Sequence, residues 1–242
     1  MLIVMAALVP VTALEQVEVH KDASATIAAA RQTQSYTLIY VQRGAEEARG
    51  DLWNAYNAAL AHEQFPSQVA TTRLDLDDGD QQALIDDLDL GQIDTPIVVL
   101  VAPNGAITWG DPQAVDVDAV RSSLLPATDQ AIIRAFQQQQ GALICIETGD
   151  AKQDANARSG VDAAMALDVV SEAVDKITVE PGMAGRDALL KALRLPAEPD
   201  QPITMLLVPP GRIAGQIKGP TERDAVLGLI LQAMNSGGGC CP

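Results

Sequence analysis

The pattern of apolar and polar residues repeats itself at a spacing of about 106 residues. Residues 94–109, DTPIVVLVAPNGAITW, and residues 200–216, DQPITMLLVPPGRIAGQ, each contain a proline, a short continuous apolar run, a turn and a second run. An uninterrupted apolar run of this length is typical of a strand that is covered on both faces. Asn104-Gly105 and Pro210-Gly211 have the turn chemistry of a hairpin. Each segment therefore predicts a buried strand followed by a hairpin.

The other elements follow the same order in both halves. In the first half we expect helices over residues 23–34, 46–62, 80–90 and 116–125, and strands over residues 17–19, 36–41 and 69–76. In the second half we expect helices over residues 129–139, 154–174, 187–195 and 222–234, and strands over residues 142–146 and 176–179. Matching residues stay 105 or 106 apart to the end of both halves, which indicates a duplication.

Each unit thus has the order α, β, α, β, α, β, β, α. Connections through helices predict parallel strands with right-handed crossovers, and the closing hairpin adds an antiparallel strand. The predicted fold class is α/β, with two mixed sheets of four to five strands, each flanked by helices on both faces. We expect a leader over residues 1–14, domains over residues 15–126 and 127–235, and a Gly/Cys tail over residues 236–242. Each domain is long enough to bury its own core.

This order resembles the thioredoxin-like superfamily twice over, across nearly the whole chain. The residues that carry the resemblance are Thr95-Pro96 and Gln201-Pro202, which immediately precede the two buried strands. They match the site at which that family has a cis proline. In the family, the residue before this proline presents backbone groups that pair with a bound polypeptide as an added strand would. The resemblance therefore implies cis bonds at Pro96 and Pro202 and a polypeptide-binding role for these four residues.

The chain departs from the redox enzymes of that family at the position of their Cys-x-x-Cys motif. After the first central strand it has residues 42–47, QRGAEE, and after the second it has residues 147–150, ETGD. Neither segment contains sulfur, so thiol exchange through the usual site is excluded. The chain is more similar to non-catalytic thioredoxin-like pairs, such as the middle domains of protein disulfide isomerases, which bind polypeptides. We expect no catalytic residues and no cofactor.

The chain is acidic, with 16 basic and 32 acidic residues and a net charge of −16. The excess is uneven, because residues 15–126 carry 6 basic and 18 acidic residues while residues 127–242 carry 10 and 14. Nucleic acids and anionic membranes are poor partners for such a protein, since few cations are present to neutralise phosphates. Cations or basic segments of other proteins are better candidates.

The N-terminal residues 1–14, MLIVMAALVPVTAL, are apolar and uncharged. Val11-Thr12-Ala13 offers the small residues at which a signal peptidase cleaves, although no Lys or Arg precedes the apolar run. We expect export to the periplasm or the extracellular space, with cleavage near Ala13, and no membrane span in the mature chain. The alternative is a cytoplasmic protein in which this run is a buried strand or a ragged terminus.

The three cysteines are too few for a disulfide scaffold. Cys145 lies in an apolar strand and is expected to be an inert core residue. Cys240 and Cys241 adjoin each other after a flexible Ser-Gly-Gly-Gly segment. Adjacent thiolates can exchange with a disulfide or bind Cu(I) or Hg(II), so this pair is a candidate soft-metal or thiol-redox site. The alternative is a disordered end.

Residues 75–94 hold eight aspartates and no basic residue. The fragment Asp75-Leu76-Asp77-Asp78-Gly79-Asp80 is similar to a calcium loop, but its glycine stands one place early and no Glu occupies the twelfth position. A solvated strand end and helix start explains the stretch more simply, and weak cation binding stays open. His20 and His62 have no nucleophile near them in the sequence and are expected at the surface.

Three hypotheses remain for the function. The first is a non-catalytic exported protein that binds polypeptide, as a folding helper or an assembly component, in an apolar groove beside Pro96 or Pro202. The second is a thiol or soft-metal acceptor that uses Cys240 and Cys241. The third is a purely structural duplicated domain, which would show neither property.

Overall fold

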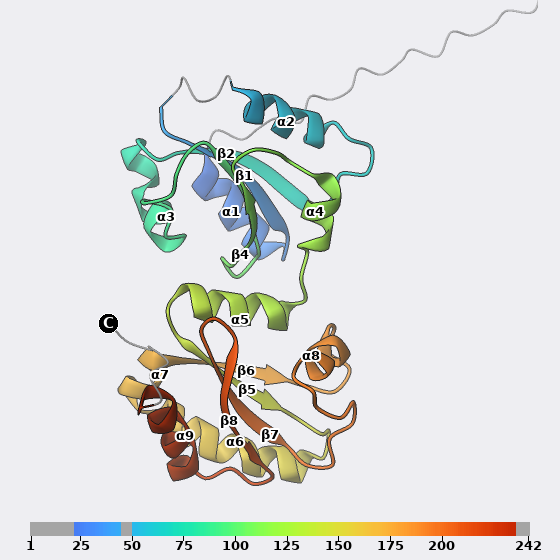
Figure 1. Ribbon diagram of the computed structural model, residues 1–242, viewed down its shortest axis with the longest axis vertical. Helices are drawn as coiled ribbons and strands as arrows, with labels where there is room; N and C mark the ends of the chain where they lie inside the picture. The colour runs from blue at the N-terminus through green and yellow to red at the C-terminus, as the bar shows by residue number, and fades with distance from the viewer. Residues whose placement is uncertain (1–21, 45–49, 236–242) are drawn as a thin grey trace, which may run out of the picture.

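The computed structural model describes residues 22–44 and 50–235 and contains two four-stranded sheets, one in each half (Figure 1). Several sequence-based predictions concern residues outside these ranges: the leader, the strand over residues 17–19, the start of the helix over residues 46–62, and the Cys240-Cys241 tail. None of the helices within the described ranges is both long and apolar enough to cross a bilayer.

The elements of the first half lie close to their predicted positions. They are α1 (Ala23–Gln32), β1 (Tyr36–Gln42), α2 (Asp51–Leu60), β2 (Val69–Asp75), η2 (Gly79–Gln81), α3 (Gln82–Asp87), β3 (Ile97–Val101), β4 (Ile107–Asp111) and α4 (Val117–Ser122). Carboxylates cap α1 and α4: Asp22 accepts from Ala25 N at 3.0 Å and Asp116 accepts from Asp118 N at 2.9 Å. Each satisfies a backbone donor that the first helical turn leaves without a partner.

The second half repeats this order. Its elements are α5 (Ala127–Gln137), β5 (Gly141–Ile146), α6 (Ala151–Met165), α7 (Asp168–Ala173), β6 (Val174–Val179), α8 (Arg186–Ala192), β7 (Ile203–Val208), β8 (Arg212–Lys218) and α9 (Arg223–Asn235). The single helix predicted over residues 154–174 is wrong, because the chain forms α6 and α7 separately and Val174 already belongs to β6. The apolar period runs on through the break, so it does not reveal the change in helix direction.

The strand orders are β2-β1-β3-β4 and β6-β5-β7-β8. The first two strands of each sheet pair in parallel, and the other pairs are antiparallel. The predicted fold class is therefore confirmed as α/β, with two four-stranded mixed sheets that have helices on both faces.

One expectation about strand direction is wrong, since β3 and β7 follow helices and yet run antiparallel to their central strands. The six residues of α3 span only about 9 Å, whereas the seven residues of β2 extend over about 23 Å. Because such a short helix does not return the chain to the opposite end of the sheet, β3 starts beside the end of β1, with Ile97 opposite Val41.

The central strands are buried on both faces, as their apolar sequences require. On β1, Leu38 and Tyr40 pack toward α2 and α4, while Ile39 and Val41 pack toward α1 and α3. The second sheet is covered in the same way, by α6, α7 and α9 on one face and by α5 and α8 on the other.

Helix α5 lies between the two halves (Figure 1). Its Ile133 packs against the core of the first half, while Phe136 packs into the second. Arg134 Nη2 lies 2.9 Å from Asp87 Oδ1, and the side-chain amide of Gln137 bonds both the N–H and the carbonyl of Ile107, at 3.1 and 2.9 Å. These bonds tie α5 to the edge of the first domain.

Candidate functional site

In the second half, the end of β5 is the position at which a thioredoxin-like enzyme carries its thiols. Glu147 stands there and is only 8% exposed. Its Oε1 lies 3.2 Å from Arg158 Nε as an ion pair, and its backbone carbonyl accepts from Arg186 Nη2 at 2.9 Å. Burial raises the pKa of Glu147, and the nearby Arg158 lowers it by less. The end of β5 thus carries a buried, paired carboxylate.

Two further carboxylates accept hydrogen bonds from the backbone N–H groups at and just before the start of α6, directly after Glu147. Asp154 is 2% exposed and accepts from Thr148 N at 2.9 Å, Thr148 Oγ1 at 3.1 Å and Gly149 N at 2.9 Å. Asp150 caps the helix through Lys152 N and Gln153 N. These are the donors that would otherwise stabilise a thiolate at a helix N-terminus. In this protein they bond to its own side chains.

In the first half, the corresponding segment is residues 42–47, of which Gln42, Arg43 and Gly44 lie within the described residues. Gln42 is fully buried, with its Nε2 3.4 Å from Asp75 Oδ2. Asp75 also accepts from Gly44 N and Asp77 N, each at 3.0 Å. Burial raises the pKa of Asp75, but these hydrogen bonds together bring it below its ordinary value. The end of β1 is thus also held by an amide and a carboxylate.

The two proline sites differ. The Thr95–Pro96 bond is cis and both residues are half-buried. In the described part of the chain the other cis bond is Pro209–Pro210, so the cis bond that the resemblance implied at Pro202 is wrong. The two isomers of an X–Pro bond differ little in free energy, so local packing decides between them. Pro202 is buried, and its carbonyl accepts from Gly219 N at 2.8 Å as an extension of the β7–β8 pairing.

The sequence analysis expected an apolar groove beside Pro96 or Pro202, and the hollow that Pro202 lines is small. The space between Pro202, Glu147 and Arg158 is about 10 Å³, which barely admits one water. Gln201 is half-buried, and Thr204 Oγ1 lies 3.2 Å from Thr221 Oγ1 behind the proline. The role predicted for Thr95, Pro96, Gln201 and Pro202 in polypeptide binding stays a prediction.

Of the three cysteines, Cys145 lies within the described residues. Cys145 is 6% exposed, and burial raises the pKa of its thiol to about 11, which suits the predicted inert core residue. Cys240 and Cys241 lie outside the described residues, so their thiol or metal chemistry stays a prediction. A thiol titration of the full chain, compared with a variant ending at Ser236, would test it.

The aspartates of residues 75–94 take different structural roles. Asp78 caps η2 through Asp80 N at 3.0 Å, and Asp87 pairs with Arg31 at 2.6 Å as well as with Arg134. Within residues 22–44 and 50–235, no three His, Cys, Asp or Glu side chains gather in an arrangement that could hold a metal ion. His62 accepts from Gln64 N through Nδ1, and His20 lies outside the described residues.

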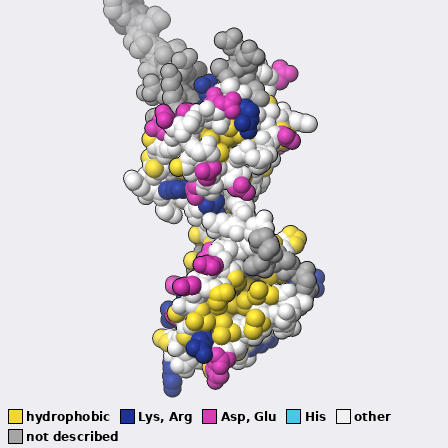
Figure 2. Space-filling view, turned by 90° about the vertical axis from the view of Figure 1, so that its left-hand side faces the viewer, with side chains coloured by type: hydrophobic (Ala, Val, Ile, Leu, Met, Phe, Trp, Pro, Cys, Tyr) yellow, Lys and Arg dark blue, Asp and Glu magenta, His cyan; other side chains and the backbone are white. Residues whose placement is uncertain are grey.

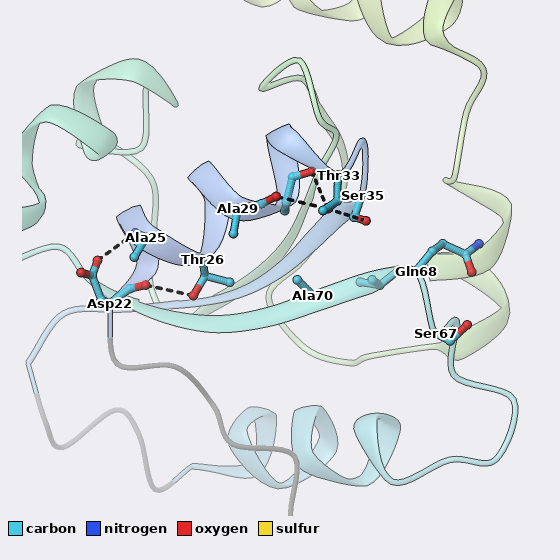
Figure 3. A pocket seen from close by; sticks show the side chains of 11 residues that line it. Asp22, Ala25, Thr26, Ala29, Thr33, Ser35, Ser67, Gln68 and Ala70 are labelled. Carbon is cyan, nitrogen blue, oxygen red and sulfur yellow. Dashed lines mark hydrogen bonds between the residues drawn. The ribbon is translucent and has the colours of Figure 1, made fainter.

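A cavity of about 650 Å³ lies between α1 and the start of the edge strand β2 (Figure 3). Its walls are small side chains, among them Ala25 and Ala29, and a few polar ones. The carboxylate of Asp22 caps α1, and the hydroxyls of Thr26 and Thr33 donate to carbonyls of the same helix. These polar groups are engaged in local structure, so the cavity offers little to recognise a ligand.

A second hollow, which we call the α7/α9 groove, has the opposite character. It lies between these two helices, encloses about 520 Å³ and has one charged lining residue, Glu172. The other lining residues are apolar: Leu167, Val169, Val170, Ala173, Leu227, Ile230, Leu231 and Met234. Figure 2 shows hydrophobic side chains gathered in one patch over the second half.

The α7/α9 groove concentrates the exposed apolar surface of the protein. Of the six exposed large apolar side chains in the described part of the chain, four line it: Leu167, Val169, Leu231 and Met234. Val169 is 72% exposed and Leu231 is 58% exposed. A contiguous exposed apolar patch marks an interaction site more often than isolated apolar residues do. The sequence analysis missed this site, although residues 223–235 contain more apolar positions than one buried helix face requires.

No protein-family model and no curated protein sequence matches the chain. Among solved structures, it is similar to human ERp44 in two forms. The zinc-bound form has 15% identity and a TM-score of 0.38, with 88% of this chain and 56% of that chain covered. Form II has 15% identity and a TM-score of 0.40, with 97% and 61% covered. The chain thus spans roughly three fifths of ERp44.

A further similar structure is that of the first two thioredoxin domains of Saccharomyces cerevisiae Eps1p. It has 10% identity and a TM-score of 0.29, and the match covers 83% of this chain and 94% of that chain.

Proposed function

We propose that this protein is a non-catalytic pair of thioredoxin-like domains that binds other polypeptides, as a folding helper or an assembly component. The observation that carries the proposal is the α7/α9 groove, in which apolar side chains remain exposed instead of packing in the core. The free energy falls when a partner covers exposed apolar surface of this kind. A folding helper and an assembly component both need such a surface.

The proposed absence of enzymatic activity follows from the chemistry at the ends of β1 and β5. The resemblance places the family's thiols within residues 42–47 and 147–150, and neither segment contains sulfur that could attack a disulfide. Cys145 is buried with a raised pKa. In this proposal the fold has kept its scaffold and has lost the nucleophile.

We also propose that the protein works outside the cytoplasm, after removal of residues 1–14. The apolar, uncharged character of that segment supports export. Cell fractionation followed by N-terminal sequencing tests this part. A cytoplasmic protein that retains Met1 would contradict it.

Binding of reduced, unfolded polypeptides tests the central proposal. We expect the full chain to bind a labelled unfolded protein with micromolar affinity, measured by fluorescence anisotropy, because the groove presents apolar side chains to it. Leu231→Asp should abolish this binding, since it places a charge in the groove. Ile213→Asp is the matched control, because Ile213 is a similarly exposed apolar residue on β8, outside the groove. No association of the wild-type chain at micromolar concentration would overturn the proposal.

A further inference from the structure

The two walls of the α7/α9 groove are helices, and this limits what it can bind. Leu227, Leu231 and Met234 stand at positions i, i+4 and i+7 of α9 and so form one stripe along the helix. The same helix buries a second apolar face, with Val226, Leu229 and Ala233 toward the sheet. Leu227 still packs against the core, but Leu231 and Met234 are exposed and are surplus to the core of the second half.

The shape of the groove favours a third helix as its occupant. Neither α7 nor α9 presents the free backbone groups of a sheet edge, so an extended segment lying here would leave its own N–H and C=O groups without partners. A helix satisfies its backbone internally and can place side chains at i, i+3, i+4 and i+7 between the side chains of the two walls.

The charges beside the groove determine which charge a partner should carry. Asp168 and Glu172 are the charged residues of α7, and residues 225–235 of α9 contain none. Arg223, at the far end of α9, pairs with Asp224 at 3.1 Å. Glu172 lines the groove and Asp168 lies on the same helix, α7, while Figure 2 shows both acidic and basic groups beside the hydrophobic patch.

The net charge of −16 argues against a second copy of this chain as the occupant, because it would bring like charges together. We propose that the α7/α9 groove binds an amphipathic helix of another protein whose apolar stripe is bordered by Lys or Arg. This inference rests on the proposed polypeptide-binding function and names the partner of the same groove.

The test uses the full chain and labelled peptides of about 16 residues, long enough to span α9. One peptide carries a Leu/Met stripe at helical spacing with Lys borders, and a second has Glu in place of each Lys. A third has the composition of the first with the stripe scrambled. We expect the Lys peptide to bind at least ~10-fold more tightly than either of the others, a difference of about 1.4 kcal/mol. Raising the salt concentration should reduce the difference in affinity between the Lys peptide and the Glu peptide.

Charge reversal in the protein sharpens the test. The double variant Asp168→Lys, Glu172→Lys should invert the preference toward the Glu peptide. The matched control is Asp187→Lys, Glu198→Lys, which makes the same change in net charge at exposed sites away from the groove. Glu172→Gln alone, which leaves the first turn of α7 intact, should reduce the preference for the Lys peptide in the same direction.

Several results would overturn the inference. Equal binding of the Lys and Glu peptides would remove the charge argument, and equal binding of the scrambled peptide would remove the helix argument. Lys-peptide binding that survives Leu231→Asp would place the site elsewhere. A dimer of the wild-type chain in sedimentation that Leu231→Asp dissociates would assign the groove to a second copy. Binding only by a variant that ends at Asn235 would assign it to the chain's own tail.

The outcomes also separate this inference from the proposed function. If unfolded protein binds and the Lys peptide has no advantage, only the nature of the partner is wrong. If neither unfolded protein nor any of the peptides binds, the proposed function itself fails.

Discussion

The closing helices of the two halves occupy the same place in the repeat and differ in what they present to solvent. In the first half, Asp118-Ala119-Val120 lies in α4, which has six residues and buries only Val120. In the second half, Asp224-Ala225-Val226 lies in α9, which has thirteen residues and buries one apolar face while it exposes another. Six residues make fewer than two helical turns, so α4 is too short to carry a second stripe.

This difference shows how a duplicated fold acquires a new surface. The core of the first half takes only Val120 from its closing helix, whereas the core of the second half takes residues as far along α9 as Ala233. The added turns of α9, together with the separate helix α7, create the α7/α9 groove without altering the sheet. The ends of the two central strands also differ, because Gln42 meets Asp75 in one half while Glu147 meets Arg158 in the other.

The largest expected effect concerns the contact that holds α9 in place. A Cβ at Gly160 of α6 would lie 1.8 Å from the carbonyl oxygen of Thr221, just before α9. Since that oxygen belongs to the backbone, Gly160→Ala should push α9 away and lower the free energy of unfolding by about 3 kcal/mol. Urea denaturation measures it.

Gly228 of α9 is the matched control for that substitution. A Cβ there would meet no atom within 4 Å, so Gly228→Ala should raise stability by about 0.5–1 kcal/mol through helix propensity. The first half has Ala55 where the second has Gly160. If Gly160→Ala is as stable as the wild type, α6 and α9 do not approach each other as closely as the structure shows.

The next effect concerns the closed site at the end of β5. Arg186 is 7% exposed and donates to the carbonyls of Val179 and Glu147, each at 2.9 Å. Arg186→Ala leaves both acceptors buried without these donors, and should lower the free energy of unfolding by about 2–3 kcal/mol. Lys191→Ala, an exposed change on the same helix, should cost less than about 0.5 kcal/mol. A similar loss in the two variants would contradict the structural role of Arg186.

The carboxyl groups at the ends of β1 and β5 should change the stability in opposite directions as the pH rises. The pKa of Asp75 is below its ordinary value of 3.8, so its stabilising contribution is present above that pH and is lost as the pH falls further. The pKa of Glu147 is raised above its ordinary value of 4.5, so its protonated form favours folding, and that stability is lost as the pH rises from 4.5 through the folded pKa.

Two isosteric variants measure this contrast by denaturation between about pH 3 and 7, a range that brackets both carboxyl groups. As the pH rises, Glu147→Gln should gain stability relative to wild type, whereas Asp75→Asn should lose it. Parallel pH profiles for the two variants would mean that the two sites are electrostatically alike.

The smallest effect on stability is expected inside the groove. Leu231 is 58% exposed, so Leu231→Ala should change the free energy of unfolding by less than about 0.5 kcal/mol. Leu229, two residues earlier and 7% exposed, should cost about 3 kcal/mol when it is changed to Ala. Polypeptide binding should show the reverse order, because Leu231→Ala should weaken binding more than Leu229→Ala does. Thermal denaturation and anisotropy on the same samples check both halves of this prediction.

Most of the fold could be predicted because its strands are local features. The continuous apolar runs at Ile97–Val101 and Ile203–Val208 and the turns after them are visible over a few residues, and the repeat places them in two sheets. The absence of sulfur from residues 42–47 and 147–150 can also be read directly, but the buried contacts of Gln42 and Glu147 were not predicted.

The α7/α9 groove and the closed state of the second proline site could not be predicted. Leu229 and Leu231 are the same residue type two places apart, and only the packing of α9 on the sheet decides which one is buried. Similarly, Arg186 and Glu147 are 39 residues apart and meet only in the folded chain.

The sequence by itself determined the duplication, the positions of the strands and the loss of the thiol motif, because each depends on residues close together or at a constant spacing. The tertiary structure decided the direction of β3, the isomer at Pro202, the filled space beside Glu147 and the exposed stripe of α9. These features depend on which surfaces meet after the chain has folded. The spacing of apolar residues shows which faces of a helix are apolar, but it does not show which of those faces a neighbouring element covers.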